Sequence, residues 1–198
     1  METYFESIRI GTPLDRYEFK KIKKGIIMGL IACYQLISDN RLKELEGIYS
    51  ENADETVDFI EELEEEVTDD SIIDMDKMWD VMHFVLTGFG SDDKLENSLL
   101  SEAVLGTSIN EESEEYIASI PKEKIANIIK ELEAFDIQKA LEDFSMEKCK
   151  EAELYPDIWD YEDEEDEIKE DLKNYYYQLI DFYKKALKSS SNILVTIL

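Results

Sequence analysis

The chain has 198 residues, of which 43% are hydrophobic and 11% aromatic, so it is long and apolar enough to form a globular core. Its net charge is −28: the first 27 residues carry six basic and four acidic side chains, and the remaining 171 carry 15 basic and 45 acidic, a balance of −30. This field excludes nucleic acid and anionic membranes as partners and favours a basic protein surface, although many proteins use such charge only for solubility.

Cysteine content and hydropathy bear on the cellular compartment. Cys33 and Cys149 are too few for a disulfide framework, and both lie in apolar-patterned segments, which favours reduced, buried thiols. No apolar run is long enough to span a membrane, and the N-terminus lacks the pattern of a signal peptide. We therefore expect a cytoplasmic protein, and no oligomeric state follows from the sequence.

The segment before residue 28 differs from the rest of the chain in the sign of its charge. Lys23-Lys24-Gly25 can be encoded by a purine-rich stretch that resembles a ribosome-binding site shortly before Met28. We therefore expect residues 1–27 to be an N-terminal extension and residues 28–198 to form the domain, with Met28 as the natural start. An ordinary N-terminal arm is the alternative, and other codons at positions 23–25 would remove the argument.

The first half of the domain reads as one strand followed by three helices. Residues 26–37 are apolar and β-prone, which predicts a buried central strand, and residues 41–48 predict a short helix. The next helix begins at Asp54, with core positions at helical spacing: Val57, Ile60, Leu63 and Val67. A further helix is expected to be capped by Asp74 or Asp76 and to end at Thr87-Gly88; its core stripe is Met75, Trp79, Met82 and Leu86.

The second half is also mostly helical. Residues 88–93 read as a loop, residues 99–105 as a short element of unassigned type, and residues 115–119 as a weak strand. Helices are predicted after Pro121, over residues 136–152 and over residues 162–187, with a break at Tyr155-Pro156 and a terminal strand over residues 192–198. We therefore predict a single compact α+β domain, dominated by helices, with a small mixed sheet.

The run from Asp74 to Gly88 reads Asp-x-Asp-Lys-x-Trp-x-x-x-His and closes on Leu-Thr-Gly. This segment resembles the central motif of the YfbM-like family, a bacterial domain of unknown function. Supporting matches are Met28-Gly29-Leu30-Ile31 with Tyr34 and Ser38, the Ser101, Ala103 and Gly106 element, and Tyr155-Pro156-x-Ile158-Trp159. The family often has a glycine pair where this chain has Gly106-Thr107. The resemblance covers residues 28–198 and implies a compact α+β fold without a settled activity.

His83, the single histidine, is the candidate for chemistry. On a helix it lies three residues from Asp80 and seven from Asp76, so a carboxylate could orient it as a general base. No sequence motif supplies a nucleophile, and a packed histidine bonded to an acid or to the backbone is the competing interpretation. We expect no cofactor and no metal, and we interpret the acidic run at residues 160–167 as a solvated helix start.

The predicted site is a small aromatic cleft formed by the two segments that best match the family. Its members are Trp79, His83, Thr87, Gly106, Tyr155 and Trp159. The acidic balance, concentrated at residues 61–70 and 151–171, favours a non-enzymatic protein that binds a basic partner, as an immunity or inhibitor protein does. The alternative is a small-molecule-binding or hydrolase-like protein that uses His83.

Overall fold

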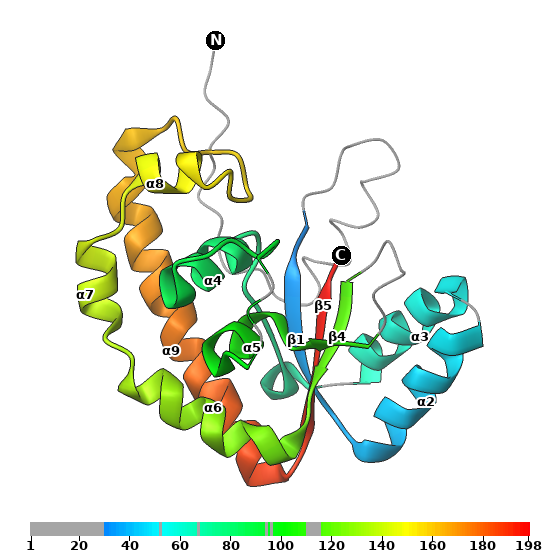
Figure 1. The fold of residues 1–198 in the computed structure, drawn as a ribbon. Coiled ribbons are helices and arrows are strands. Elements are labelled where there is room, and N and C mark those ends of the chain that lie inside the picture. The colour runs from blue at the N-terminus through cyan, green and yellow to red at the C-terminus, as the bar shows by residue number, and fades with distance from the viewer. Residues whose placement is uncertain (1–29, 52, 67, 94, 96, 110–115) are drawn as a thin grey trace.

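The computed structural model describes residues 30–198 apart from residues 52, 67, 94, 96 and 110–115. An antiparallel sheet with the strand order β2-β1-β5-β4-β3 lies at its centre. The strands are β1 (Ala32–Ile37), β2 (Ile72–Asp74), β3 (Thr107–Ser108), β4 (Tyr116–Ile120) and β5 (Asn192–Ile197). Figure 1 shows helices on both faces of this sheet, which makes one layered α+β domain and confirms the predicted fold class.

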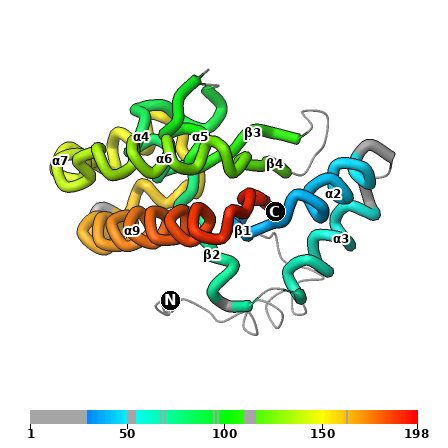
Figure 2. Tube along the Cα trace, turned by 90° about the horizontal axis from the view of Figure 1, so that it is seen from below, coloured from blue at the N-terminus to red at the C-terminus, as the bar shows by residue number. Residues whose placement is uncertain are grey.

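One face of the sheet is covered by two helices and the other by the rest of the helical layer (Figure 1). The pair consists of α2 (Asp39–Glu51) and α3 (Ala53–Glu66). The larger layer contains α4 (Trp79–Thr87), α5 (Leu99–Leu105), α6 (Lys122–Ala134), α7 (Ile137–Glu142), α8 (Met146–Glu151) and α9 (Glu165–Ser189). Two short 3-10 turns, η1 (Asp69–Ser71) and η2 (Glu162–Glu164), precede β2 and α9. In Figure 2, α6 and α9 run side by side.

The middle strand β5 explains why the core has two halves. All six of its residues are buried, because β1 and β4 pair with its two edges and helices cover both of its faces. Alternate residues point to opposite sides: Leu194 packs with α2 and α3, whereas Ile193 and Val195 belong to the larger core under α4–α9. The apolar terminal strand predicted from the sequence is therefore the centre of the molecule.

Several sequence predictions need correction. The sheet was expected to be mixed, but the pairings β1–β2, β1–β5, β3–β4 and β4–β5 are all antiparallel. The first strand begins at Ala32, and the expected residues 26–29 lie outside the described part of the chain. The helix predicted over residues 136–152 is two helices, because the hydroxyl of Ser145 accepts a hydrogen bond from the backbone N–H of Lys148 and begins α8.

The cysteines follow the sequence prediction. Cys33 and Cys149 are both buried and form no disulfide. Burial raises the pKa of the Cys149 thiol to about 12, and the charge of Glu165 adds to the rise. Within the described residues, none of the helices has the length and apolar character needed to cross a membrane.

Candidate functional site

Helix α4 carries three of the six residues of the predicted cleft, and its beginning differs from the expectation. Neither Asp74 nor Asp76 caps the helix; Met78 occupies the N-cap position without a side-chain bond. Instead, Oδ1 of Asp74 accepts a hydrogen bond from the N–H of Asp76 at 2.8 Å, in a turn that gives Asp76 a φ of +46°. The carbonyl of Asp76 accepts from the N–H of Ala32 at 3.1 Å, so this turn is fastened to β1.

Asp76 is not placed as a partner of His83. The groups whose charges act on the His83 pKa are Asp80 and Asp93. Burial raises the pKa of Tyr155, and the charge of Asp76 adds to that rise. The charge of Asp76 thus acts on the pKa of Tyr155 and of Tyr175.

His83 is fully buried, and both of its ring nitrogens have partners. Nδ1 lies 2.9 Å from the carbonyl oxygen of Phe89, and Nε2 lies 2.7 Å from Oγ of Ser101. Because a carbonyl oxygen can only accept, Nδ1 carries the proton and Nε2 accepts a hydrogen bond from the Ser101 hydroxyl. Burial lowers the pKa of His83, and the Phe89 carbonyl and the charges of Asp80 and Asp93 only partly oppose this effect. The imidazole is therefore neutral near pH 7.

Asp80 has a different role from the one that its spacing suggested. Asp80 is 5% exposed, and its carboxylate accepts two backbone hydrogen bonds. Oδ1 accepts from the N–H of Ser91 at 2.8 Å, and Oδ2 accepts from the N–H of Tyr155 at 2.9 Å. Asp80 thus joins two loops that are 64 residues apart in the chain, counted from Ser91 to Tyr155, and acts on His83 only through its charge.

The end of α4 is shaped by Thr87 and Gly88. The hydroxyl of Thr87 donates to the carbonyl of His83 at 2.7 Å and accepts from the N–H of Phe89 at 3.2 Å. Gly88 has a φ of +80°, and its N–H donates to the carbonyl of Phe84 at 2.7 Å, as expected for a left-handed C-cap. These contacts turn the chain sharply so that the carbonyl of Phe89 points back to His83.

The aromatic members of the predicted cleft are only partly brought together. The rings of Trp79 and Tyr155 stack with centroids 5.9 Å apart and an interplanar angle of 28°, and Nε1 of Trp79 donates to the carbonyl of Leu30 at 3.2 Å. Trp159 is 3% exposed, and its Nε1 donates to the carbonyl of Leu154 at 2.7 Å. Trp159 is thus a core residue. Its hydrogen bond to Leu154 closes the loop of residues 154–159, which contains the cis peptide bond Tyr155–Pro156.

Gly106 lies at the end of α5, against the sheet. Its φ is +68°, and a Cβ at this position would lie 3.1 Å from Cβ of Ala118 and 3.3 Å from the carbonyl of Ser119. The glycine is therefore required by the close approach of α5 to β4. An open groove of about 610 Å³ lies nearby, between α2 and the β3–β4 edge, and none of the predicted cleft residues lines it; its lining is Glu46, Tyr49, Thr107, Ser108, Ile109, Ser119, Pro121 and Lys124. That the predicted residues form a ligand cleft stays a prediction.

Ser101 is the polar partner that sequence reasoning did not connect to His83. Its distance from Nε2 is that of a serine nucleophile and its general base. The surroundings are less suited to catalysis, because Ser101 is buried and its N–H donates to Oγ of Ser98 at 3.3 Å, which removes one donor for an oxyanion. Among the described residues, no group of three or more His, Cys, Asp or Glu side chains is arranged to hold a metal ion.

The fold and the buried polar network define a helix-rich α+β domain whose signature residues bond to one another and to loop backbone. The chain belongs to the family described as "Domain of unknown function (DUF1877)", which it matches over residues 28–196. Protein YfbM of Escherichia coli (strain K12) is 30% identical over 126 residues, which is 63% of this chain and 75% of that protein. The crystal structure of YfbM from Escherichia coli, a protein of unknown function, matches with a TM-score of 0.70 and 27% identity over 85% of this chain and 99% of that one.

Proposed function

We propose that this protein binds a basic protein partner in the bacterial cytoplasm, as an immunity or inhibitor protein does, and that it does so without catalysis. The observation that carries the proposal is the excess of exposed carboxylates on two parts of the surface. Helix α3 contains eight acidic residues and no basic one. The guanidinium of Arg41 is shared by three carboxylates, those of Glu44 at 2.8 Å and of Glu62 and Glu66 at 3.1 Å each, so the charge of this face stays strongly negative.

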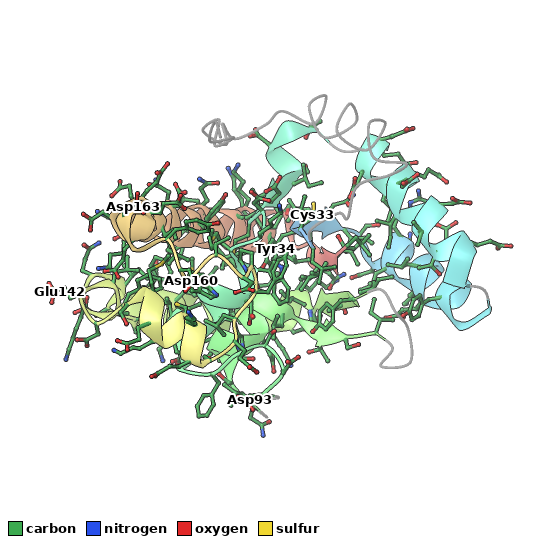
Figure 3. All side chains as sticks on the ribbon, turned by 90° about the horizontal axis from the view of Figure 1, so that it is seen from above. Cys33, Tyr34, Asp93, Glu142, Asp160 and Asp163 are labelled. Atoms are coloured by element: carbon green, nitrogen blue, oxygen red, sulfur yellow. The ribbon has the colours of Figure 1, made fainter. Side chains whose placement is uncertain are left out.

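The second acidic surface lies around the beginning of α9. Figure 3 shows Asp160 and Asp163 near α8 and the start of α9, away from Cys33 and Tyr34 in the sheet. Lys150 pairs with Asp160, and Lys169 pairs with Glu165 at 2.6 Å, whereas the exposed Asp163, Asp166 and Glu167 form no ion pair with any described residue. Clustered carboxylates of this kind accelerate encounter with a cationic surface, and the gain falls as salt shortens the screening length to about 8 Å at physiological strength.

The test is recovery of a basic partner from the source organism. The tagged protein is incubated with cell extract at low and at high salt, and the bound proteins are identified by mass spectrometry. We expect a basic protein that is retained at low salt and released at high salt. Recovery of no basic protein at low salt, or binding that is indifferent to salt, contradicts the proposal.

Two variants with the same net charge then distinguish the effect of a local acidic surface on association from the effect of net charge. The triple variant Asp163→Asn, Asp166→Asn, Glu167→Gln removes three exposed carboxylates at the start of α9. Its control, Glu46→Gln, Glu123→Gln, Glu131→Gln, removes three exposed carboxylates from α2 and α6 and has the same net charge. We expect the first variant to slow association several-fold more than the control.

A hydrolase-like activity is the second candidate, and the contact of 2.7 Å between Ser101 and His83 is the observation that favours it. The neutral imidazole could take the hydroxyl proton of Ser101 as this oxygen attacks an ester or amide carbonyl. The test is labelling with a fluorophosphonate probe, which reacts with activated serines. Labelling of the native protein that disappears in Ser101→Ala supports this function, and absence of labelling in the folded protein excludes it.

A further inference from the structure

We propose that the partner is contacted by one preorganised surface, formed by the loop of residues 88–93 and the adjacent segment of residues 153–157, with the ring of Phe89 as its apolar anchor. This inference rests on the proposed function, because it names the surface and the chemistry of the partner. The surface includes part of the acidic segment 151–171 and would fit an apolar recess surrounded by lysine or arginine side chains.

The loop is held by polar side chains of α4, of which those of His83 and Asp80 are buried. His83 donates from Nδ1 to the carbonyl of Phe89, and Thr87 accepts from the N–H of the same residue. The carboxylate of Asp80 accepts from the N–H of Ser91. A buried histidine and a buried carboxylate are unfavourable unless they are paired, and here both are paired with the backbone of this loop. The signature residues of α4 therefore fix the shape of the loop.

The second segment is fastened to the first by the same carboxylate. The other oxygen of Asp80 accepts from the N–H of Tyr155, and the side chain of Leu154 packs so closely that a Cβ on Gly90 would lie 3.3 Å from it. Before it, Glu153 adopts a φ of +52°, and the N–H of Leu154 donates to the carbonyl of Cys149 at 3.1 Å, which ends α8. The two segments thus form one surface although they are far apart in the chain.

The exposed side of this surface combines an aromatic ring with carboxylates. Phe89 is 49% exposed although its backbone is fixed by the contacts above. The exposed acidic side chains on the two segments are Asp92, Asp93, Glu153 and Asp157, and Figure 3 shows Asp93 at the outer edge of the molecule. An aromatic residue whose backbone is already fixed loses less conformational entropy on binding, and aromatic anchors carry much of the binding energy in protein interfaces. The acidic surroundings favour a cationic partner.

The experiment uses a phage-displayed library of random 12-residue peptides as the probe and the full-length protein as the target. We expect the selected peptides to combine lysine or arginine with an apolar side chain. Their affinity is measured for the wild type, for Phe89→Ala and for the control Leu187→Ala, which removes a side chain of similar exposure, 47%, from α9. We expect Phe89→Ala to weaken binding about tenfold or more and Leu187→Ala to leave it within about twofold.

The outcomes separate this inference from the proposed function. Basic peptides that bind Phe89→Ala as tightly as the wild type overturn the surface but support a cationic partner. Peptides that depend on Phe89 but carry no basic residue overturn the cationic partner, and with it this inference. Absence of any enriched peptide contradicts both. Circular dichroism and thermal unfolding of each variant confirm that folding is retained, which is expected because both side chains are about half exposed.

Discussion

Nε2 of His83 lies 2.7 Å from Oγ of Ser101, and this contact joins α4 to α5 inside the core. Since Nδ1 of the same ring bonds to the carbonyl of Phe89, the imidazole connects two helices and a loop. A serine and a histidine at this distance are typical of a catalytic pair, but both side chains are buried. The contact therefore has a structural consequence that can be measured independently of any activity.

Removal of the Ser101 hydroxyl is expected to destabilise the protein. Ser101→Ala leaves the buried Nε2 of His83 without a donor, which costs about 1–3 kcal/mol in the free energy of unfolding. Urea denaturation measures this loss. Ser91→Ala is the control, because Ser91 contributes its backbone N–H to Asp80, a contact that the substitution retains. Equal stability of the two variants would contradict the structural role of the contact.

Stability is expected to fall as the pH falls below the ordinary pKa of histidine. Burial lowers the pKa of His83 in the folded state, so the unfolded chain binds the proton more readily than the native one. The resulting stability is fully present above about pH 6.5 and is lost as the pH falls from there towards the lower folded-state pKa.

Because the chain has one histidine, the window between about pH 5.5 and 7.5 reports mainly on His83. The measurement is the free energy of unfolding by urea at several pH values in this window, for the wild type and for His83→Gln. We expect the variant to be less stable and less dependent on pH. A slope that is the same in both proteins would mean that other groups cause it.

Asp80→Asn is expected to loosen both loops that the carboxylate holds. An amide has one acceptor oxygen where the carboxylate has two, so one of the N–H groups of Ser91 and Tyr155 faces an NH₂ donor. We expect a loss of about 1.5–3 kcal/mol and faster hydrogen exchange at these two amides. Asp92→Asn is the exposed control and should leave both quantities nearly unchanged. Slow exchange at both amides in Asp80→Asn would contradict the role of the Asp80 carboxylate in holding the two loops.

Two glycines with positive φ provide a matched comparison. A Cβ at Gly88 would have no atom within 4 Å. Gly88→Ala is therefore expected to lower the free energy of unfolding only by the cost of placing alanine in the left-handed conformation, about 1 kcal/mol. Gly106 combines a φ of +68° with a ψ of −162°, a region that is almost restricted to glycine, and its Cβ would meet Ala118 at 3.1 Å. Gly106→Ala should therefore lower the melting temperature clearly more than Gly88→Ala. The reverse order would show that α5 can move away from β4 at little cost.

The sequence by itself determined the elements whose patterns are long and regular. Trp79, Met82 and Leu86 of the predicted stripe form the buried face of α4, and Gly88 marked its end, because helical spacing and a left-handed cap are local properties of the chain. Met75, the first member of that stripe, is buried but lies before the helix. The apolar terminal residues likewise indicated β5. The α+β class follows from such elements together, since each must bury one apolar face.

Only the tertiary structure decided the short elements and the partners of the polar residues. Strands β2 and β3 have three and two residues, too few to show a period, and exist because neighbouring strands pair with them. The spacing of Asp80 and His83 suggested that they bond to each other, but Asp80 bonds to Ser91 and Tyr155, and His83 bonds to Phe89 and Ser101. A buried polar group bonds to whatever backbone or hydroxyl the packing brings within 3 Å, and this depends on contacts between residues distant in the sequence.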